Sequence, residues 1–558
     1  MESLSSSLSP FLRERCNIIS TSSTTTTPSY VLYICTNTLR TNDNPSLDVA
    51  IQLSNAFNLP LLVHAFFDDK SIHATARRAV FILDAIREIE KSYLTKAIPF
   101  TFQLTGINNT SRQPAYLTLA SRATIVVTDE PFCEPYLSIT DKIKKCTKSN
   151  TMITVDSALE VPARLISKSK CSRAYNYRSA ALKQFHQRCT LPYPTLTATV
   201  SSQSSLELKQ FNLPNHLFIK LLEHPSSHEL IKGCTHLDHS VLPVDHTLGG
   251  MAAGKARWRS FLRHGYKTYN KTRNDPLKHH KNGVSRISPY LNLGMLSPFQ
   301  VARDCCKIKG PASLKYLDEF CTWRGIAYTW CYHHPNHRRS AKYAIPNWAY
   351  QTLTKHANDN RKVISLETLC VGQTGQRLWD ICQQGLNATG ELHNNLRMTW
   401  GKEVLKWTRG PEESYRTLLH LNDRYALDAL SPPSIAGILW CLGWGDSAKQ
   451  ESNMYGTVRS RSAASISKRY DLVALDKEWR KLRDGSIGGG GLISAFRRSG
   501  NGSGSSSSSS SDGIVRAVAT PVSGGKKRKI DDGDSERQGK SSKVNKGSIQ
   551  HFFNVETK

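Results

Sequence analysis

The chain has 558 residues, of which 39% are hydrophobic, and its formal net charge at pH 7 is +29. This length accommodates two folded domains and a tail. The longest apolar run, residues 59–67, is too short to span a bilayer, so we expect a soluble protein. The large positive charge favours a polyanionic partner, most simply nucleic acid, although a generally basic organism or compartment would also produce it.

The 14 cysteines are scattered, and none occurs in a Cys-x-x-Cys pair. Zinc and iron–sulfur sites usually carry such spacings, so we expect reduced intracellular thiols and no metal site. Three histidines lie close together in the sequence, and we expect them to be surface residues of a basic loop: His333, His334 and His337.

Residues 1–28 are rich in Ser and Thr, which is typical of a disordered leader. An organelle transit peptide is the alternative, which the acidic residues Glu2 and Glu14 disfavour. From residue 29 to 165, buried-strand runs alternate with helical stretches, a pattern that predicts a parallel, Rossmann-like α/β domain. The expected strands lie at residues 30–35, 59–67, 123–130 and 150–157.

The remaining chain divides into three parts. Residues 166–245 are polar and weakly periodic, which predicts a connector. In residues 246–450 strand signals are absent and amphipathic helices alternate with breaks marked by Pro and Gly, so this domain is expected to be all-α. Residues 451–558 consist mostly of Ser, Gly and charged residues, and we expect them to form a disordered tail.

One helix of the second domain is expected to begin near Glu391. A spacing of three or four residues places five side chains on one of its faces: His393, Arg397, Trp400, Val404 and Trp407. A core face normally carries aliphatic residues, and a buried arginine needs an anionic partner. A snorkelling arginine beside two packing tryptophans is the structural alternative.

Several segments resemble, in the same order, motifs of the DNA photolyase/cryptochrome family of blue-light flavoproteins. Residues 389–398 (TGELHNNLRM) resemble TG-x-MHN-x-(L/V)RM. Residues 421–428 (LNDRYALD) are similar to LNDRYELD of the class II photolyases and the short bacterial photolyases of cyclobutane pyrimidine dimers. Residues 37–50, 269–291 and 317–324 resemble further family motifs. The resemblance implies an N-terminal α/β domain followed by a helical FAD-binding domain.

The resemblance implies FAD as the cofactor. In the family the residues that match Tyr269, Ser285 and Arg286 hold the diphosphate, and the hydroxyls of Ser285 and Ser288, with the amides of a helix start, have suitable chemistry for it. The carboxylate that matches Asp428 pairs with the arginine that matches Arg397 beside the flavin. The cofactor-binding residues implied in this way are Tyr269, Ser285, Arg286, Ile287, Ser288, Glu319, Arg324, Arg397 and Asp428. An antenna chromophore in the α/β domain, a folate or a deazaflavin, is left open.

The resemblance also implies light-driven repair of cyclobutane pyrimidine dimers in UV-damaged DNA. Reduced flavin would absorb blue light and donate an electron to a dimer flipped out of the duplex. A chain of tryptophans would reduce the oxidised flavin, and its candidates, in an order that the sequence leaves open, are Trp379, Trp400, Trp407 and Trp440. The residues implied for contact with damaged DNA are Trp323, His393, Asn394 and Met398.

Three positions depart from the family pattern around the expected pocket. Gly325 replaces the glutamate that hydrogen-bonds the damaged bases, and such a bond is worth about 1–3 kcal/mol in a buried site. Pro433 replaces the asparagine that faces flavin N5, for which Ser434 is a potential substitute, and Gly385 replaces a longer polar residue near the substrate. The alternative to repair is therefore a cryptochrome-like photoreceptor or DNA-binding flavoprotein, and a nuclear scaffold without flavin is a third hypothesis.

Two segments of the tail predict partners. Residues 546–553 (KGSIQHFF) resemble the box that docks on the replication sliding clamp, with Lys546 in place of the usual Gln and with Ile549, Phe552 and Phe553 as the hydrophobic anchors. A basic run is typical of a nuclear localisation signal read by importin, or of a solvated charge run: Lys526, Lys527, Arg528 and Lys529. We expect a nuclear monomer, with a chloroplast or mitochondrion as the alternative if the leader is a transit peptide.

Overall fold

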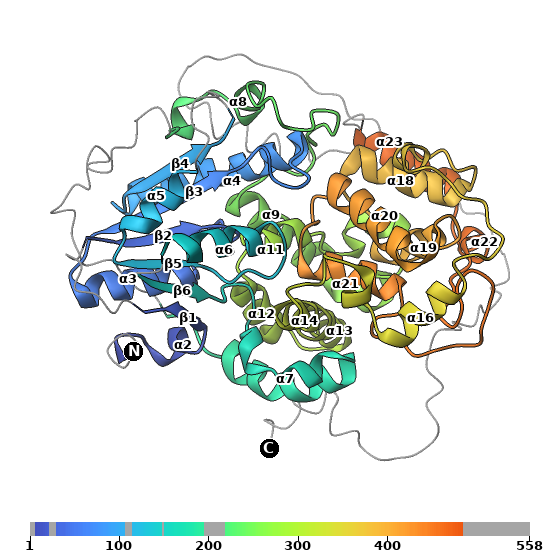
Figure 1. Cartoon of the computed structure of the whole chain (residues 1–558), viewed down its shortest axis with the longest axis horizontal. Helices are drawn as coiled ribbons and strands as arrows, with labels where there is room; N and C mark the ends of the chain where they lie inside the picture. Colours follow the sequence, from blue (N-terminus) through green and yellow to red (C-terminus); the bar gives the residue numbers. More distant parts are fainter. Residues whose placement is uncertain (1–5, 22–28, 107–113, 148–149, 195–217, 484–558) are drawn as a thin grey trace, which may run out of the picture. The chain divides into compact units, whose positions relative to one another are not determined.

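The computed structural model describes residues 6–21, 29–106, 114–147, 150–194 and 218–483, in which an α/β layer precedes a helical region (Figure 1). The α/β layer comprises residues up to 155, and the helical region runs from 174 to 483. The predicted fold class, a Rossmann-like sheet followed by an all-α domain, is confirmed. In the described ranges no helix is long and apolar enough to cross a membrane.

The sheet has six strands in the order β1-β6-β5-β2-β3-β4. All neighbours pair in parallel except β1 and β6, which are antiparallel. The strands are β1 (Cys16–Ser20), β2 (Val31–Cys35), β3 (Leu61–Phe67), β4 (Phe100–Leu104), β5 (Ile125–Asp129) and β6 (Thr151–Val155). Sequence analysis predicted four of these, while β4 and β1 were missed.

Helices cover both faces of the sheet, which explains why β2, β5 and β6 are buried at every position. On one side lie α3 (Pro45–Phe57) and α4 (Ala76–Thr95), and on the other α5 (Ala115–Arg122) and α6 (Tyr136–Cys146). From β2 the sheet is extended on one side by β3 and β4 and on the other by β5 and β6. The carboxyl ends of β2 and β5 therefore form the topological switch point, where open α/β sheets usually bind ligands.

The prediction that residues 1–28 form a disordered leader is wrong for residues 6–21. Residues 6–21 contain α2 (Pro10–Arg13) and the edge strand β1. Arg15, only 1% exposed, anchors them by donating to the carbonyl oxygens of Leu159 and Glu160 at 2.6 and 2.8 Å. Composition concealed this strand because its short apolar stretch lies within a run of Ser and Thr.

The helical region accounts for the rest of the described chain. Its α-helices are α7 (Ala174–Cys189), α8 (Ser227–Ile231), α9 (Met251–His264), α10 (Tyr269–Thr272), α11 (Ser288–Asn292), α12 (Pro298–Lys307), α13 (Pro311–Leu317), α14 (Gly325–His333), α15 (Ala341–Ala344), α16 (Asn347–Lys355), α17 (Leu366–Val371), α18 (Arg377–Thr389), α19 (Asn394–Val404), α20 (Gly410–Tyr425), α21 (Pro432–Cys441), α22 (Ala463–Ser467) and α23 (Leu472–Arg483). A π-helix, η9 (Asp318–Arg324), joins α13 to α14. Shorter turns of 3-10 or π type are η1 (Ala163–Leu165), η2 (Lys168–Cys171), η5 (Leu221–Glu223), η6 (Tyr266–Thr268), η7 (Pro276–Lys278) and η8 (His279–Gly283).

Two predicted boundaries differ from the structure. The segment 166–245, predicted as a connector, contains the 16-residue helix α7. The prediction of a disordered tail from residue 451 is wrong for residues 451–483, because α22 and α23 are part of the helical region. Trp479 of α23 is 5% exposed and packs on α18, so burial of this large side chain holds α23 in place.

Arginines of α4 join the α/β layer to the helical region. The Arg77 guanidinium donates to the carbonyl oxygens of Leu386 and Tyr425 at 3.2 and 2.7 Å, near the ends of α18 and α20. Arg78 donates to Asp423 O at 3.1 Å. Because the last carbonyls of a helix have no partner within it and carry partial negative charge, these contacts fix both helix ends.

Candidate functional site

An ion pair between α19 and the turn after α20 is the first feature of the candidate site. Arg397 Nη2 lies 2.9 Å from Asp428 Oδ1, and the two side chains are only 13% and 19% exposed. The carboxylate expected for the buried arginine is therefore present. Removing one member of such a pair is costly, because the other charge is left poorly solvated.

Neighbouring segments hold the turn that carries Asp428. Ser431 Oγ, at the start of α21, donates to the carbonyl oxygen of Asp428 at 2.7 Å. Asn292 Nδ2 of α11 donates to Ala429 O at 2.8 Å. The carboxylate is thus positioned before any ligand binds, and its geometry depends on α11 and α21 as well as on α20.

Three of the four candidate tryptophans form one contiguous stack. Trp379 of α18 lies nearly parallel to Trp400 of α19, with ring centroids 6.1 Å apart and an 8° angle between planes. It meets Trp407 edge-on at 5.2 Å, and its indole N–H donates to Trp400 O at 2.9 Å. In space the three rings follow one another as Trp400, Trp379 and Trp407, and we call these three residues the tryptophan stack.

Trp440 of α21 makes no ring contact with the tryptophan stack among the described residues. The Lys402 ammonium lies 4.9 Å from its ring centroid. Burial lowers the pKa of Lys402 to about 8, so the side chain is mainly protonated at pH 7. A cation over the ring opposes removal of an electron from it, which makes Trp440 the weakest of the four candidates for electron transfer.

The loop predicted to hold a diphosphate leads into α11. Ser288, the first residue of this helix, is exposed, whereas Ile287 is buried beneath it. Tyr316 Oη donates to Ser285 Oγ at 3.0 Å, and the Tyr316 ring lies 5.0 Å from that of the buried Tyr269. The Tyr316 hydroxyl therefore supports Ser285, which is half-buried, while Ser288 is exposed at the start of α11.

Arg286, predicted to contact the cofactor, has a protein partner. Its Nε and Nη2 atoms donate to the two carboxylate oxygens of Glu391 at 2.6 and 2.8 Å. Arg257 and His279 approach the same carboxylate at 3.4 and 3.2 Å. Burial alone would raise the pKa of Glu391, but Arg286, His279 and Arg257 hold it well below its usual range. Sequence analysis missed Glu391, whose only signal was an acidic residue within the motif at 389–398.

The predicted cofactor residues of η9 also bind protein groups. Glu319 accepts from Arg273 Nη2 at 2.6 Å, and Arg324 donates to Ala158 O at 2.7 Å. These charges join η9 to neighbouring segments, and no described contact brings them to Arg397. Trp323 differs, because 40% of its surface is exposed.

Among the residues expected to contact damaged DNA, His393 is hydrogen-bonded on both ring nitrogens to the protein backbone. As the N-cap of α19, its Nδ1 accepts from Asn395 N at 3.2 Å, and its Nε2 donates to Arg273 O at 3.0 Å. Burial lowers its pKa to about 3, so the ring is neutral. Asn394 is exposed and Met398 is half-buried, and both remain accessible on α19.

Two of the family departures are packing adaptations. A Cβ atom added at Gly325 would lie 2.4 Å from Tyr177 Oη, and Tyr177 of α7 is buried. Gly385, expected near the substrate, is instead covered by Trp479 of α23, whose ring would lie 1.7 Å from an added Cβ. Each glycine thus provides space for an aromatic side chain from a helix that sequence analysis did not predict.

The third departure, Pro433, lies exposed in the first turn of α21, where proline is compatible with a helix. The adjacent Ser434 is buried and accepts a hydrogen bond from Asn422 Nδ2 at 2.6 Å. Asn422 is itself 2% exposed and belongs to the segment 421–428. The Asn422 amide also donates to Asp423 Oδ1 at 2.9 Å, so it is held within the protein and joins Ser434 to the end of α20.

The predicted clamp-binding residues and the basic run lie outside the described residues. They are Ile549, Phe552 and Phe553, and Lys526, Lys527, Arg528 and Lys529. Both predictions stay predictions.

No protein-family model matches the chain. It is 26% identical over 457 residues to the deoxyribodipyrimidine photo-lyase of Methanothermobacter thermautotrophicus, covering 82% of this chain and 96% of that protein. The protein of the same name from Arabidopsis thaliana is 27% identical over 460 residues, which cover 80% of this chain and 90% of that protein. That of Potorous tridactylus is 30% identical over 247 residues, covering 43% and 46%.

Solved structures show the same fold. A bacterial class III photolyase from Agrobacterium tumefaciens superimposes with a TM-score of 0.57 and 16% identity, covering 82% of this chain and 88% of that one. A cryptochrome from Synechocystis gives a TM-score of 0.60 and 16% identity, covering 82% and 89%. Similarity at this level of identity establishes the architecture alone.

Proposed function

Because the chain belongs to the DNA photolyase/cryptochrome family, we propose that it is an FAD-dependent deoxyribodipyrimidine photo-lyase, an enzyme that repairs cyclobutane pyrimidine dimers in DNA with blue light. The two relatives that match 82% and 80% of its length carry that name. The observation that carries the proposal is the tryptophan stack, which ends on the helix that also carries Arg397 and its partner Asp428.

The donor set fits a flavin dinucleotide. The hydroxyls of Ser285 and Ser288 suit a diphosphate, and the Arg397–Asp428 pair presents a cation and a carboxylate together for the polar part of the flavin. FAD supplies the light absorption and the transferred electron. The contribution of this chain is to hold the cofactor in one orientation and to stabilise negative charge beside Arg397.

The tryptophan stack gives electrons a route from Trp407 through Trp379 to Trp400. Trp379 and Trp400 are 1% and 2% exposed, while Trp407 is 7% exposed and forms the outer end. Successive ring contacts of 5.2 and 6.1 Å keep each transfer short. The stack therefore serves to replenish the electron that a light-driven cofactor needs.

Damaged DNA is the proposed substrate. The net charge of +29 favours attachment to the phosphate backbone. Trp323 is an exposed aromatic side chain of the kind that stacks on an unpaired base, and Asn394 and Met398 lie accessible on α19. These three residues are proposed to contact the flipped dimer, whereas the neutral, engaged His393 supports the loop containing Arg273.

Light-dependent repair by the reduced protein tests the proposal directly. Purified, chemically reduced protein is mixed with an oligonucleotide that contains a thymine dimer, and repaired dimers are counted under blue light and in the dark. Repair that requires light is the expected result. Retention of flavin and DNA without repair would contradict it.

That contrary result would favour a photoreceptor or DNA-binding flavoprotein without repair. The absence of a carboxylate at Gly325 is the observation in its favour, because Tyr177 occupies the space that a side chain there would need.

Gly325→Glu is expected to destabilise the protein, because the new Cβ would overlap Tyr177 Oη at 2.4 Å. Overpacking of a filled core costs about 1–3 kcal/mol, and burial of a carboxylate adds to it. Urea unfolding should therefore occur at a lower midpoint, and Gly325→Ala should show a smaller shift in the same direction. Unchanged midpoints for both variants would show that Tyr177 does not fill this space.

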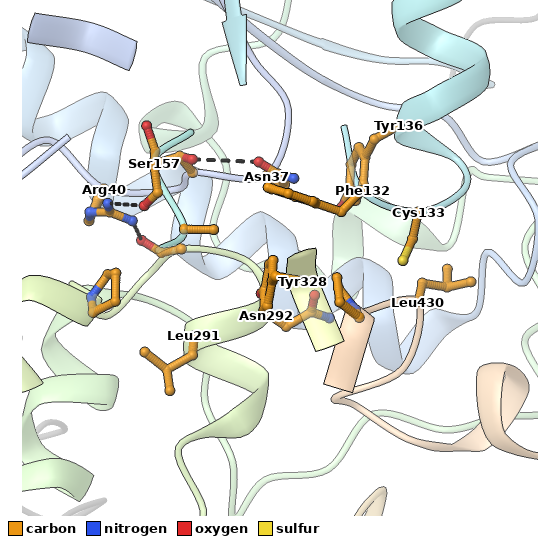
Figure 2. A pocket seen from close by; sticks show the side chains of 15 residues that line it. Asn37, Arg40, Phe132, Cys133, Tyr136, Ser157, Leu291, Asn292, Tyr328 and Leu430 are labelled. Atoms are coloured by element: carbon orange, nitrogen blue, oxygen red, sulfur yellow. Dashed lines mark hydrogen bonds between the residues drawn. The ribbon is translucent and has the colours of Figure 1, made fainter. Parts of the chain in front are cut away.

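For the antenna chromophore that the sequence leaves open we propose the switch point, where a cavity of about 10 Å³ must widen to admit a folate or a deazaflavin (Figure 2). Asn37 and Arg40 after β2, and Phe132 and Tyr136 after β5, line it. Arg40 already donates to Gly294 O at 3.0 Å, so recognition here relies on aromatic and amide groups more than on free charge. Absorption and fluorescence of material released from purified protein distinguish a folate from a deazaflavin, and release of neither would contradict the proposal.

Phe552→Ala combined with Phe553→Ala is expected to abolish binding to the replication sliding clamp, because both aromatic anchors of the box are lost. The measurement is a pull-down with the full-length chain and purified clamp. Gln550→Ala is the matched control and should bind normally, since its side chain is not an anchor. Equal capture of the double variant and the original chain would exclude the box.

Nuclear delivery is proposed to depend on importin and the basic run: Lys526, Lys527, Arg528 and Lys529. Replacement of these four residues by Ala in a fluorescent fusion should move the protein out of the nucleus. Accumulation in a chloroplast or mitochondrion would instead support a transit function for the leader. The protein is proposed to act as a monomer, which light scattering can test.

A further inference from the structure

Two cysteines and a histidine from distant parts of the chain meet in the interior. Cys133 follows β5, Cys331 belongs to α14 and His337 lies in the loop after α14. Their ligand atoms all lie within 4.8 Å of one another, and the three residues are 1%, 1% and 0% exposed. His337, expected on the surface, is thus one of the most deeply buried histidines among the described residues.

The sulfur spacing matches a shared metal ion better than a disulfide. Cys133 Sγ and Cys331 Sγ are 4.0 Å apart. Two sulfurs bound to one tetrahedral Zn²⁺ at about 2.3 Å lie about 3.8 Å from each other. The sulfurs of a disulfide lie about 2.0 Å apart, so forming that bond would require both side chains to move.

The imidazole of His337 is oriented as a metal ligand. His337 Nδ1 donates to His334 O at 2.8 Å, which fixes the proton on Nδ1 and leaves the Nε2 lone pair free. A backbone carbonyl on the second nitrogen is the usual support for a metal-bound imidazole. His337 Nε2 is buried and has no hydrogen-bond partner among the described residues, and a buried polar atom of this kind is costly unless something binds it.

The local charge balance also accommodates a divalent cation. Arg338, whose charge acts on both cysteines, is paired with the buried Asp423 at 2.7 Å, so the two charges cancel. Two thiolates, a neutral imidazole and Zn²⁺ then form a site without net charge, which lowers the cost of burial. By contrast, Glu391 in the cluster with His279 and His280 is already bound by Arg286 and Arg257, which oppose a metal there.

We propose that Cys133, Cys331 and His337 bind a Zn²⁺ ion that links the α/β layer to α14. Binding releases two thiol protons to solvent, and the fourth tetrahedral position is taken by a water molecule. The ion connects segments 198 positions apart in the sequence. This site shares no residue with the proposed FAD-binding residues and does not depend on the repair activity, although Cys133 also lines the switch-point pocket.

Metal content of the full-length chain tests the proposal. Protein purified from zinc-supplemented cells should contain close to one zinc per chain by mass spectrometry, whereas Cys331→Ser and His337→Gln should lose it. Cys382→Ser is the matched control, because Cys382 is a buried thiol outside the cluster and its replacement should leave zinc in place. Loss of zinc from this control as well would overturn the assignment to the cluster.

A second measurement on the unaltered chain avoids dependence on variants that fail to fold. Zinc is removed with a chelator and replaced by Co²⁺, which should produce a thiolate-to-cobalt absorption band and raise the melting temperature above that of the metal-free protein. A chain that carries no zinc and shows no such band would overturn the proposal. So would a non-reducing peptide map in which Cys133 and Cys331 are joined by a disulfide, because oxidised sulfurs cannot bind the ion as thiolates.

Discussion

Trp379→Phe is expected to leave FAD bound but to stop its photoreduction almost completely. Trp379 is the middle ring of the tryptophan stack, within 6.1 Å of Trp400 and 5.2 Å of Trp407. A phenyl ring is much harder to oxidise than an indole, so an electron would have to pass from Trp407 to Trp400 in one long step. The measurement is the rate at which blue light bleaches the oxidised flavin band in the presence of an external reductant.

Trp440→Phe provides the matched control, since it is the same substitution in the same region but under the Lys402 ammonium. It should photoreduce at close to the original rate. Trp379→Phe protein that has been chemically reduced should still repair dimers, because the tryptophan stack only supplies the cofactor with electrons. Normal photoreduction in Trp379→Phe, or its loss in Trp440→Phe, would show that electrons follow another route.

The ion pair was predictable because it follows from charge and periodicity. Arg397 lies on a helix face with apolar and aromatic residues, where an unpaired guanidinium would be unstable, and the resemblance at 421–428 supplied Asp428. The order of the tryptophans was not predictable in this way. Trp379 and Trp400 stack because α18 and α19 pack against each other, and spacing along one helix contains no information on that packing.

The departures from the family pattern also depend on tertiary contacts that the sequence does not show. A glycine in the sequence does not reveal which side chain fills the space beside it, and Tyr177 and Trp479 come from helices that were assigned to a connector and a tail. Gly325 and Gly385 were therefore interpreted as losses around the substrate. In the structure each permits a close aromatic contact, so both glycines meet a packing requirement.

Metal-ligand spacing is informative only when the ligands are close in sequence. The absence of Cys-x-x-Cys excludes a zinc ribbon or a zinc finger built on that motif. Cys133 and Cys331, however, meet only after the α/β layer has packed on α14. The sheet order β5 next to β2 brings Cys133 to the switch point, and helix packing brings the other two ligands. Such a site depends on tertiary structure, and local sequence patterns do not contain it.

Arg397→Ala is expected to weaken FAD binding by about tenfold to a hundredfold, since the cation beside the flavin is lost and a hydrogen bond to a charged group contributes about 1.5–3 kcal/mol. Arg397 and Asp428 are 13% and 19% exposed, so the remaining carboxylate would be poorly solvated and would repel the phosphates and any anionic form of the flavin. The measurement is the dissociation constant for FAD, obtained by titrating the cofactor into stripped protein. Binding at the original affinity would show that the pair does not face the cofactor.

A double-mutant cycle separates cofactor contact from folding. In Arg397→Ala with Asp428→Ala no charge is left unpaired, so part of the unfolding free energy lost in the single variant should return, while FAD binding should stay weak because the cation is still absent. Arg178→Ala breaks a more exposed ion pair between α7 and η9, where Arg178 lies 2.7 Å from Asp318 and the two side chains are 26% and 17% exposed. This control should lower stability without weakening FAD. If the double variant regained both stability and cofactor, the arginine would act only as a counter-ion for Asp428.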